Sequence, residues 1–290
     1  MDIQTFFSQL DQVYNAGDLK AIESFLQMSL EEARRENGGA EVSVLNELMG
    51  FYRNTGRIAE ALLYTEQALL KTRALDLVKS AGWGTTLLNA ATAFQAAGNK
   101  ERARELYREA EQVYRELLPQ GDPLFSALYN NMSGLYAEDG DLAAAAELLL
   151  RALEITAGLD GMEIEQAIMR VNLGGMYTNL GKDTEALAEI TAALSIYDEQ
   201  AGPDGKKDPH YAAALAALAA HRQREGRRQE AAALYEQALE EIQMHYGKNR
   251  HYYLTCRNLA RVYLAIGEQE QSARYFAIAG DEPPRDGGGP

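Results

Sequence analysis

The stretch that decides the fold is residues 89–110, which read NAATAFQAAGNKERARELYREA. Two small residues precede Phe94, Gly98 follows that aromatic by four positions, and Ala103 and Ala110 stand seven apart. The apolar positions before the glycine fall on one stripe of a helix with 3.6 residues per turn. Glycine ends such a helix because the left-handed conformation costs it little. The stretch therefore predicts a hairpin of two helices, here called helix A and helix B.

The same pattern returns along the whole chain at nearly constant spacing. Successive landmark glycines are separated by 39, 42, 42, 41, 45 and 41 residues. Counted from each of the last six landmarks, position −4 is aromatic with one exception, and positions +5 and +12 are small. The landmarks are Gly17, Gly56, Gly98, Gly140, Gly181, Gly226 and Gly267. Since no run alternates with a period of two residues, the sequence predicts an all-α repeat array of about seven hairpins.

This pattern resembles the tetratricopeptide repeat (TPR), with a period longer than the usual ~34 residues. It is similar to the longer repeats of kinesin light chains and their bacterial relatives. The segments that carry this likeness are residues 208–212 (DPHYA), 246–251 (YGKNRH) and 258–263 (NLARVY). The resemblance implies a right-handed superhelical solenoid whose function is to bind other polypeptides rather than to catalyse a reaction.

The array divides into three parts by its fit to the pattern. Residues 1–41 form a divergent N-terminal capping repeat, because Tyr14 stands three and not four positions before its glycine. Residues 42–280 carry six repeats, and residues 281–290 read as a disordered tail. Without a capping helix at this end, Tyr275, Phe276 and Ile278 are either exposed for self-association or packed within their own repeat.

Composition narrows the classes of partner and compartment. The formal net charge of −15 argues against nucleic acid as a partner, because phosphate binding needs clustered Lys and Arg. The acidity serves solubility or, alternatively, a basic partner. A single cysteine allows no disulfide framework, and the N-terminus lacks the pattern of a secretory signal. No run is long and apolar enough to span a membrane. We therefore expect a cytoplasmic protein.

One face of helix A is not needed for packing, and we call it the inner stripe. It comprises positions −13, −10, −9, −6, −3 and −2, which should line the concave wall of the solenoid. Small residues at −6 leave room for a ligand backbone, and asparagine amides can hold a peptide group through one acceptor and two donors. The candidate residues are Asn46, Asn89, Asn130, Asn131, Asn172 and Asn258. Similar asparagine ladders hold peptides in kinesin light chains and Gram-positive pheromone regulators. The alternative is that these amides bond to neighbouring helices.

Basic residues gather near one end of the inner stripe. Arg257 and Arg261 are four apart and share a helix face, which favours binding of a carboxylate such as a chain terminus. A second cluster, Arg222, Arg224, Arg227 and Arg228, lies in the preceding repeat. The alternative for this region is internal pairing with Glu225, Glu230 and Glu268.

No catalytic or metal-binding constellation emerges from the remaining residues. The four histidines lack the spacing of metal ligands, and Cys256 occupies an apolar column of helix A. Trp83, the only tryptophan, is either a binding hot spot or part of the packing between repeats. Acidic side chains are scattered over helix faces. We therefore expect no enzyme activity, no cofactor and no metal.

Three functions are compatible with this reading. The first is a scaffold that binds an extended segment of another protein in its groove. The second is a sensor of a short signalling peptide, and the third is a self-assembling structural array. The sequence alone does not identify the partner.

Overall fold

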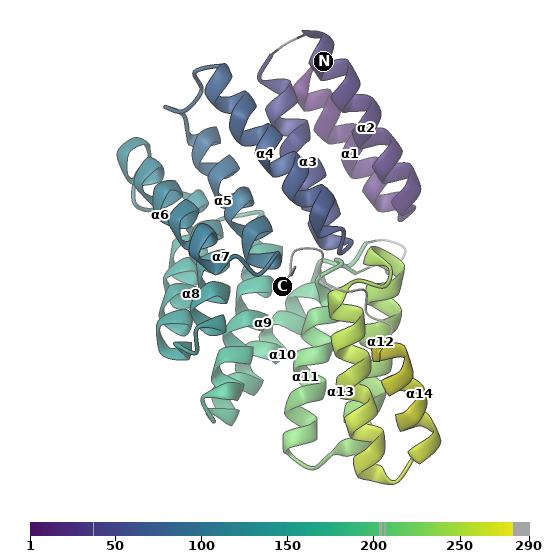
Figure 1. The fold of residues 1–290 in the computed structure, drawn as a ribbon. Helices are drawn as coiled ribbons and strands as arrows, with labels where there is room; N and C mark the ends of the chain where they lie inside the picture. Colours follow the sequence, from purple (N-terminus) through teal and green to yellow (C-terminus); the bar gives the residue numbers. More distant parts are fainter. Residues whose placement is uncertain (37, 203–204, 206, 281–290) are drawn as a thin grey trace. The chain divides into compact units, whose positions relative to one another are not determined.

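The computed structural model describes residues 1–36, 38–202, 205 and 207–280, and within them it is all-helical. Figure 1 shows consecutive helices lying side by side in pairs, as the repeat pattern predicts. The described helices are α1 (Ile3–Ala16), α2 (Leu19–Glu36), α3 (Ala40–Asn54), α4 (Ile58–Ala74), α5 (Ala81–Ala96), α6 (Lys100–Leu117), α7 (Pro123–Glu138), α8 (Leu142–Thr156), α9 (Glu163–Asn179), α10 (Asp183–Glu199), α11 (Tyr211–Arg224), α12 (Arg228–Tyr246), α13 (Arg250–Ile266) and α14 (Gln269–Gly280). Odd-numbered helices are helix A and even-numbered ones helix B.

The landmark glycines make the turn that the sequence predicts. All seven have a positive φ, between 73° and 89°. A residue with a side chain would be strained in this conformation. In six repeats the N–H after the glycine donates to the carbonyl oxygen of position −4 at 2.8–3.0 Å. Two hydrogen bonds define a Schellman helix end, and this is the one that spans the larger number of residues. The predicted hairpin turn is therefore confirmed.

The small residues of helix B let the two helices of a hairpin approach closely. The side chains at +5 and +12 are buried in every one of the six aligned repeats. Aromatic rings at −4 behave less uniformly. Tyr52 and Tyr263 stack on Tyr64 and Tyr275 of the following helix B, but Tyr136 is 39% exposed. An aromatic column on the apolar face of helix A predicts rings that fill the gap inside each hairpin, and this prediction is wrong for Tyr136, which lies at the surface.

The helices group into two compact units, Met1–Leu128 and a second that begins at Tyr129 within α7. The core of the first unit runs from Phe6 of α1 through Leu26 of α2 and Leu45 of α3 to Ala93 of α5. In the second unit, Leu173 of α9 packs with α8, and a further cluster joins α11 to α14. Each unit is thus held by repeat-to-repeat packing of apolar side chains.

The two ends of the array differ from each other. α1 and α2 form an ordinary helix pair, and the assignment of residues 1–41 as a cap stays a prediction. At the far end Tyr275 and Ile278 pack against the last cluster, while Phe276 is 40% exposed. Packing within the repeat thus holds for two of the three side chains. The predicted disordered tail, residues 281–290, lies outside the described residues.

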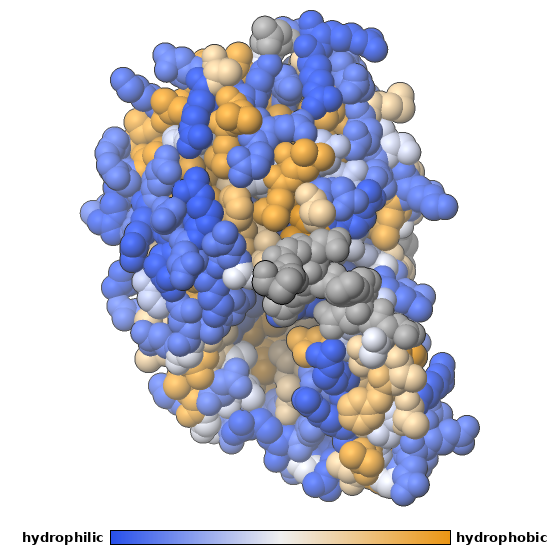
Figure 2. Space-filling view, in the orientation of Figure 1, coloured by the Kyte–Doolittle hydropathy of each residue, from blue (hydrophilic) through white to orange (hydrophobic). Residues whose placement is uncertain are grey.

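Figure 2 shows charged and polar side chains over most of the visible face, with apolar side chains appearing between them. In the described part of the chain, no helix combines the length and hydropathy needed to cross a bilayer.

Candidate functional site

Two asparagines of the inner stripe meet in the first unit. Asn89 of α5 donates from Nδ2 to Oδ1 of Asn46 of α3, at 3.4 Å. Asn46 in turn donates from its own Nδ2 to the hydroxyl of Thr86, at 3.1 Å. Both amides are half-buried. These bonds link the A helices of two successive repeats.

The second unit repeats this arrangement in the same register. Asn172 of α9 donates from Nδ2 to Oδ1 of Asn130 of α7, at 2.8 Å. In both pairs, position −10 of one repeat accepts from position −9 of the next. The alternative role that the sequence left open, bonding between neighbouring helices, is therefore present at these four residues.

The asparagine pairs keep unused hydrogen-bonding capacity. An amide nitrogen carries two hydrogens, and Asn172 uses one of them within the described residues. Asn130 accepts through Oδ1 and makes no bond from Nδ2 there. Asn131 and Asn258 are half-buried members of the same stripe, outside these two pairs. Paired amides are pre-oriented, so their remaining hydrogens point in fixed directions.

Position −6 is glycine in three repeats, at Gly50, Gly134 and Gly175, and two of these stand beside the asparagines with empty space above them. A Cβ built on Gly50 of α3 or on Gly175 of α9 would meet no atom within 4 Å. Gly50 follows Asn46 by one helical turn, so the two share a face. Glycine in a helix interior costs about 1 kcal/mol relative to alanine, and here packing does not require it.

The basic residues are mostly paired internally. Arg222 lies 2.7 Å from the Glu225 carboxylate, Arg227 lies 2.6 Å from Glu230, and Arg224 lies 3.2 Å from Asp183 of α10. The alternative of internal pairing with Glu225 and Glu230 is therefore present at Arg222 and Arg227, whereas Arg224 pairs with Asp183.

The predicted carboxylate site near the end of the stripe has a different environment. Arg261 is exposed and has no ion-pair partner among the described residues, whereas Arg257 is half-buried. Binding of a chain terminus by these two residues stays a prediction.

The remaining candidate groups have structural surroundings. Burial raises the pKa of the Cys256 thiol to about 11, which keeps it protonated and unreactive near neutral pH. Trp83 is 3% exposed, with the Arg73 guanidinium 5.4 Å from its ring centre, so it belongs to the packing between repeats. Burial, followed by repulsion from Asp11, raises the pKa of Glu47 on the inner stripe. Within the described ranges no group of three His, Cys, Asp or Glu is placed to hold a metal.

Family models add an independent line of evidence. Two models, both described as tetratricopeptide repeat, match residues 83–124 and 126–157 and residues 165–240, together about half of the chain. The chain belongs to the TPR family. No protein of curated function matches the sequence. TPR proteins generally mediate interactions between proteins, and membership of the family indicates this general role.

Solved structures show the same fold at low sequence identity. This TPR chain is similar to BtubC (BKLC) from P. vanneervenii, with a TM-score of 0.56 and 24% identity over 78% of this chain and 94% of that one. The TPR-like repeats of a putative kinesin light chain from Podospora anserina give 0.51 and 23% over 70% and 95%. NprR in complex with its cognate peptide NprX gives 0.65 and 15% over 96% and 77%.

One polar residue of the TPR core escaped the sequence analysis. His221 of α11 is 2% exposed and lines a cavity against α10. The signal was present in the alignment, because position −5 is apolar in the other aligned repeats.

Proposed function

We propose that the inner stripe binds an extended segment of another polypeptide and that the protein acts as a non-catalytic scaffold. The observation that carries the proposal is the open space at two of the three glycines at position −6. Gly50 and Gly175 have open space where a side chain would stand. Glycine destabilises a helix relative to alanine, and packing does not explain why glycine is present at these two positions. Close approach of a ligand backbone would supply that reason.

The asparagine pairs supply the hydrogen bonds that such a backbone needs. A peptide group presents one N–H and one carbonyl oxygen, and an asparagine amide can meet both. Asn46 lies one turn from Gly50, and Asn172 lies three residues before Gly175, so each glycine has an amide beside it. Because these contacts address the backbone, the stripe would hold an extended segment with little regard to its side chains.

A sensor of a short free peptide is the second candidate function. It is favoured by the similarity to NprR, whose structure was solved with its cognate peptide, over 96% of this chain. Both functions use the same stripe, but they differ in whether the ligand is free or part of a larger protein. Self-association through Phe276 ranks third, because Tyr275 and Ile278 pack inside their own repeat.

The proposal is tested with peptides selected on the parent protein from a random display library. Asn46→Ala combined with Asn172→Ala removes one amide beside each glycine. We expect the selected peptides to bind this variant about tenfold more weakly, since each lost hydrogen bond contributes about 1 kcal/mol. The measurement is the dissociation constant by titration calorimetry, with circular dichroism to show that the variant is folded.

The matched control is Gln112→Ala, which deletes an exposed amide from helix B of the second aligned repeat. This variant should bind as the parent does. Selection of no peptide by the parent, or equal affinity for parent and asparagine variant, would count against the stripe as the binding face. If the selected segments bind as part of a folded protein but not as free peptides, the sensor function is ruled out.

A further inference from the structure

One buried column of helix A contains a histidine in a single repeat. At position −5 the other aligned repeats have apolar residues, namely Phe51, Ala93, Leu135, Met176 and Val262. His221 replaces them in α11 and is only 2% exposed. Burial of a polar ring is unfavourable unless its nitrogens are hydrogen-bonded. Packing alone therefore does not explain the histidine.

The two ring nitrogens of His221 have different surroundings. Nε2 lies 3.5 Å from a carboxylate oxygen of Glu225. Nδ1 is shielded from water and has no hydrogen-bond partner in the described part of the chain. A carboxylate only accepts hydrogen bonds, so it favours the tautomer with the proton on Nε2. Nδ1 is then a buried acceptor that lacks a donor.

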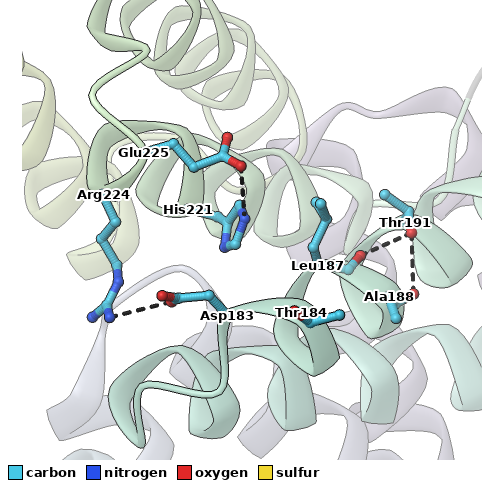
Figure 3. Close-up of a pocket in the computed structure, with 8 residues that line it drawn as sticks. All are labelled: Asp183, Thr184, Leu187, Ala188, Thr191, His221, Arg224 and Glu225. Atoms are coloured by element: carbon cyan, nitrogen blue, oxygen red, sulfur yellow. Dashed lines mark hydrogen bonds and ion pairs between the residues drawn. The ribbon is translucent and has the colours of Figure 1, made fainter.

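A cavity of about 480 Å³ adjoins this ring between α10 and α11. Figure 3 shows the imidazole of His221 extending from α11 toward α10, where it faces Leu187. Leu187 and Ala188 give the α10 side an apolar surface. The hydroxyl of Thr191 is already engaged, because it donates to the carbonyl oxygen of Leu187 at 2.8 Å. The cavity thus suits a group with an apolar body.

The charges around the cavity are matched within the protein. Arg224 lies 3.2 Å from Asp183 across the opening (Figure 3). Glu225 lies 2.7 Å from Arg222 and 3.6 Å from Arg227. A charged ligand would have to break one of these pairs to find a counter-ion, so a neutral ligand is favoured.

We propose that this cavity binds a tyrosine side chain presented by a partner protein. The phenol ring would lie against Leu187 and Ala188. A rotation of the imidazole would turn Nδ1 of His221, which is shielded in the empty cavity, toward the ligand, and the neutral hydroxyl would then donate to it. Tyrosine combines an apolar ring with one polar tip, which is why it is frequent at interface centres. This site is separate from the proposed peptide-binding stripe, since none of the candidate asparagines lines the cavity.

The experiment uses p-cresol, the tyrosine side chain as a free molecule, and toluene as the matched probe without a hydroxyl. Methyl resonances of Leu187 and Ala188 and the ¹⁵N resonance of His221 Nδ1 are followed by NMR on the full chain. We expect millimolar binding of p-cresol, about fivefold tighter than toluene, with a shift of Nδ1 caused by p-cresol alone. Equal binding of the two probes, or no shift at these methyl groups, would overturn the proposal.

Two variants locate the site. His221→Leu restores an apolar residue at position −5 and should fold. Its ratio of affinities for p-cresol and toluene should fall to about one. Ala188→Phe fills the cavity and should abolish binding of both probes, with the melting curve unchanged in shape. Retention of the p-cresol preference in His221→Leu would show that the hydroxyl is recognised elsewhere.

A free phenol is the other possible source of the same chemistry, and a third probe separates the two. N-acetyltyrosine amide carries the backbone on both sides of the side chain. Its binding, with the same Nδ1 shift, supports a tyrosine within a polypeptide. Binding of p-cresol without binding of N-acetyltyrosine amide would overturn the partner-protein assignment in favour of a small phenol.

Discussion

Replacement of Gly84 by alanine is expected to destabilise the fold by about 1–3 kcal/mol, although alanine is the better helix former. A Cβ at this position would lie 2.7 Å from Cδ1 of Tyr114 and closer still to its Cε1. Tyr114 cannot move aside easily. It is fully buried, packs edge-on against Phe125 and shares a 3.1 Å hydrogen bond with the Thr85 hydroxyl. Gly84 therefore sets how closely α5 and α6 approach.

The partner variant Tyr114→Ala should lower the free energy of unfolding by about 3–5 kcal/mol, because it leaves a large cavity. In that background the extra methyl group of Gly84→Ala has room, so its own cost should fall to about zero. The measurement is a double-mutant cycle by urea denaturation. If the losses in free energy of unfolding were additive, with no coupling between the two positions, Tyr114 would not be the reason that position 84 requires glycine.

Two adjacent glycines in α9 are expected to respond to alanine with opposite signs. At Gly174 a Cβ would lie 2.6 Å from Cγ1 of Ile190 and 3.2 Å from the carbonyl oxygen of Ala186. Part of that crowding involves backbone, so Gly174→Ala should destabilise by about 1–3 kcal/mol. At Gly175 nothing stands within 4 Å, so Gly175→Ala should stabilise by up to about 1 kcal/mol.

Thermal unfolding of the two single variants, side by side with the parent, checks this pair. Each variant is the control for the other, since the chemical change is the same and the positions are neighbours. A loss of stability in Gly175→Ala would mean that the empty space has a structural purpose. It would also remove the main support for a ligand at this position.

The hairpin architecture could be predicted because it depends on local rules. The turn at Gly98, the buried alanines at +5 and +12 and the burial of Cys256 follow from helix periodicity and from the conformational freedom of glycine. The pairing of Arg222 with Glu225 is also local, being three residues apart.

The asparagine pairs could not be predicted in the same way. Asn130 and Asn172 are 42 residues apart, and their bond depends on the rotation of one hairpin against the next. Helix periodicity gives the face on which each amide lies but not the register between repeats. Pairing of the amides between helices therefore could not be predicted from periodicity alone.

The cavity at His221 depends on packing detail of the same kind. The alignment shows a histidine in an apolar column, but only the structure shows that Nδ1 has no partner in the described part of the chain and that the residue lines a cavity. The exposed ring of Tyr136 is a similar case, since its column predicts an interior position.

The central claim is that the glycines of the inner stripe leave room for a bound polypeptide. The most direct measurement is the affinity of a peptide selected on the parent for the variant Gly50→Ala, Gly175→Ala. Gly121→Ala, at an exposed position in the loop between α6 and α7, is the control outside the stripe. We predict that the double variant melts at or above the temperature of the parent yet binds the peptide at least about tenfold more weakly, while the control binds normally. Unchanged affinity in the double variant would contradict the account, because the space above the glycines would then be unused.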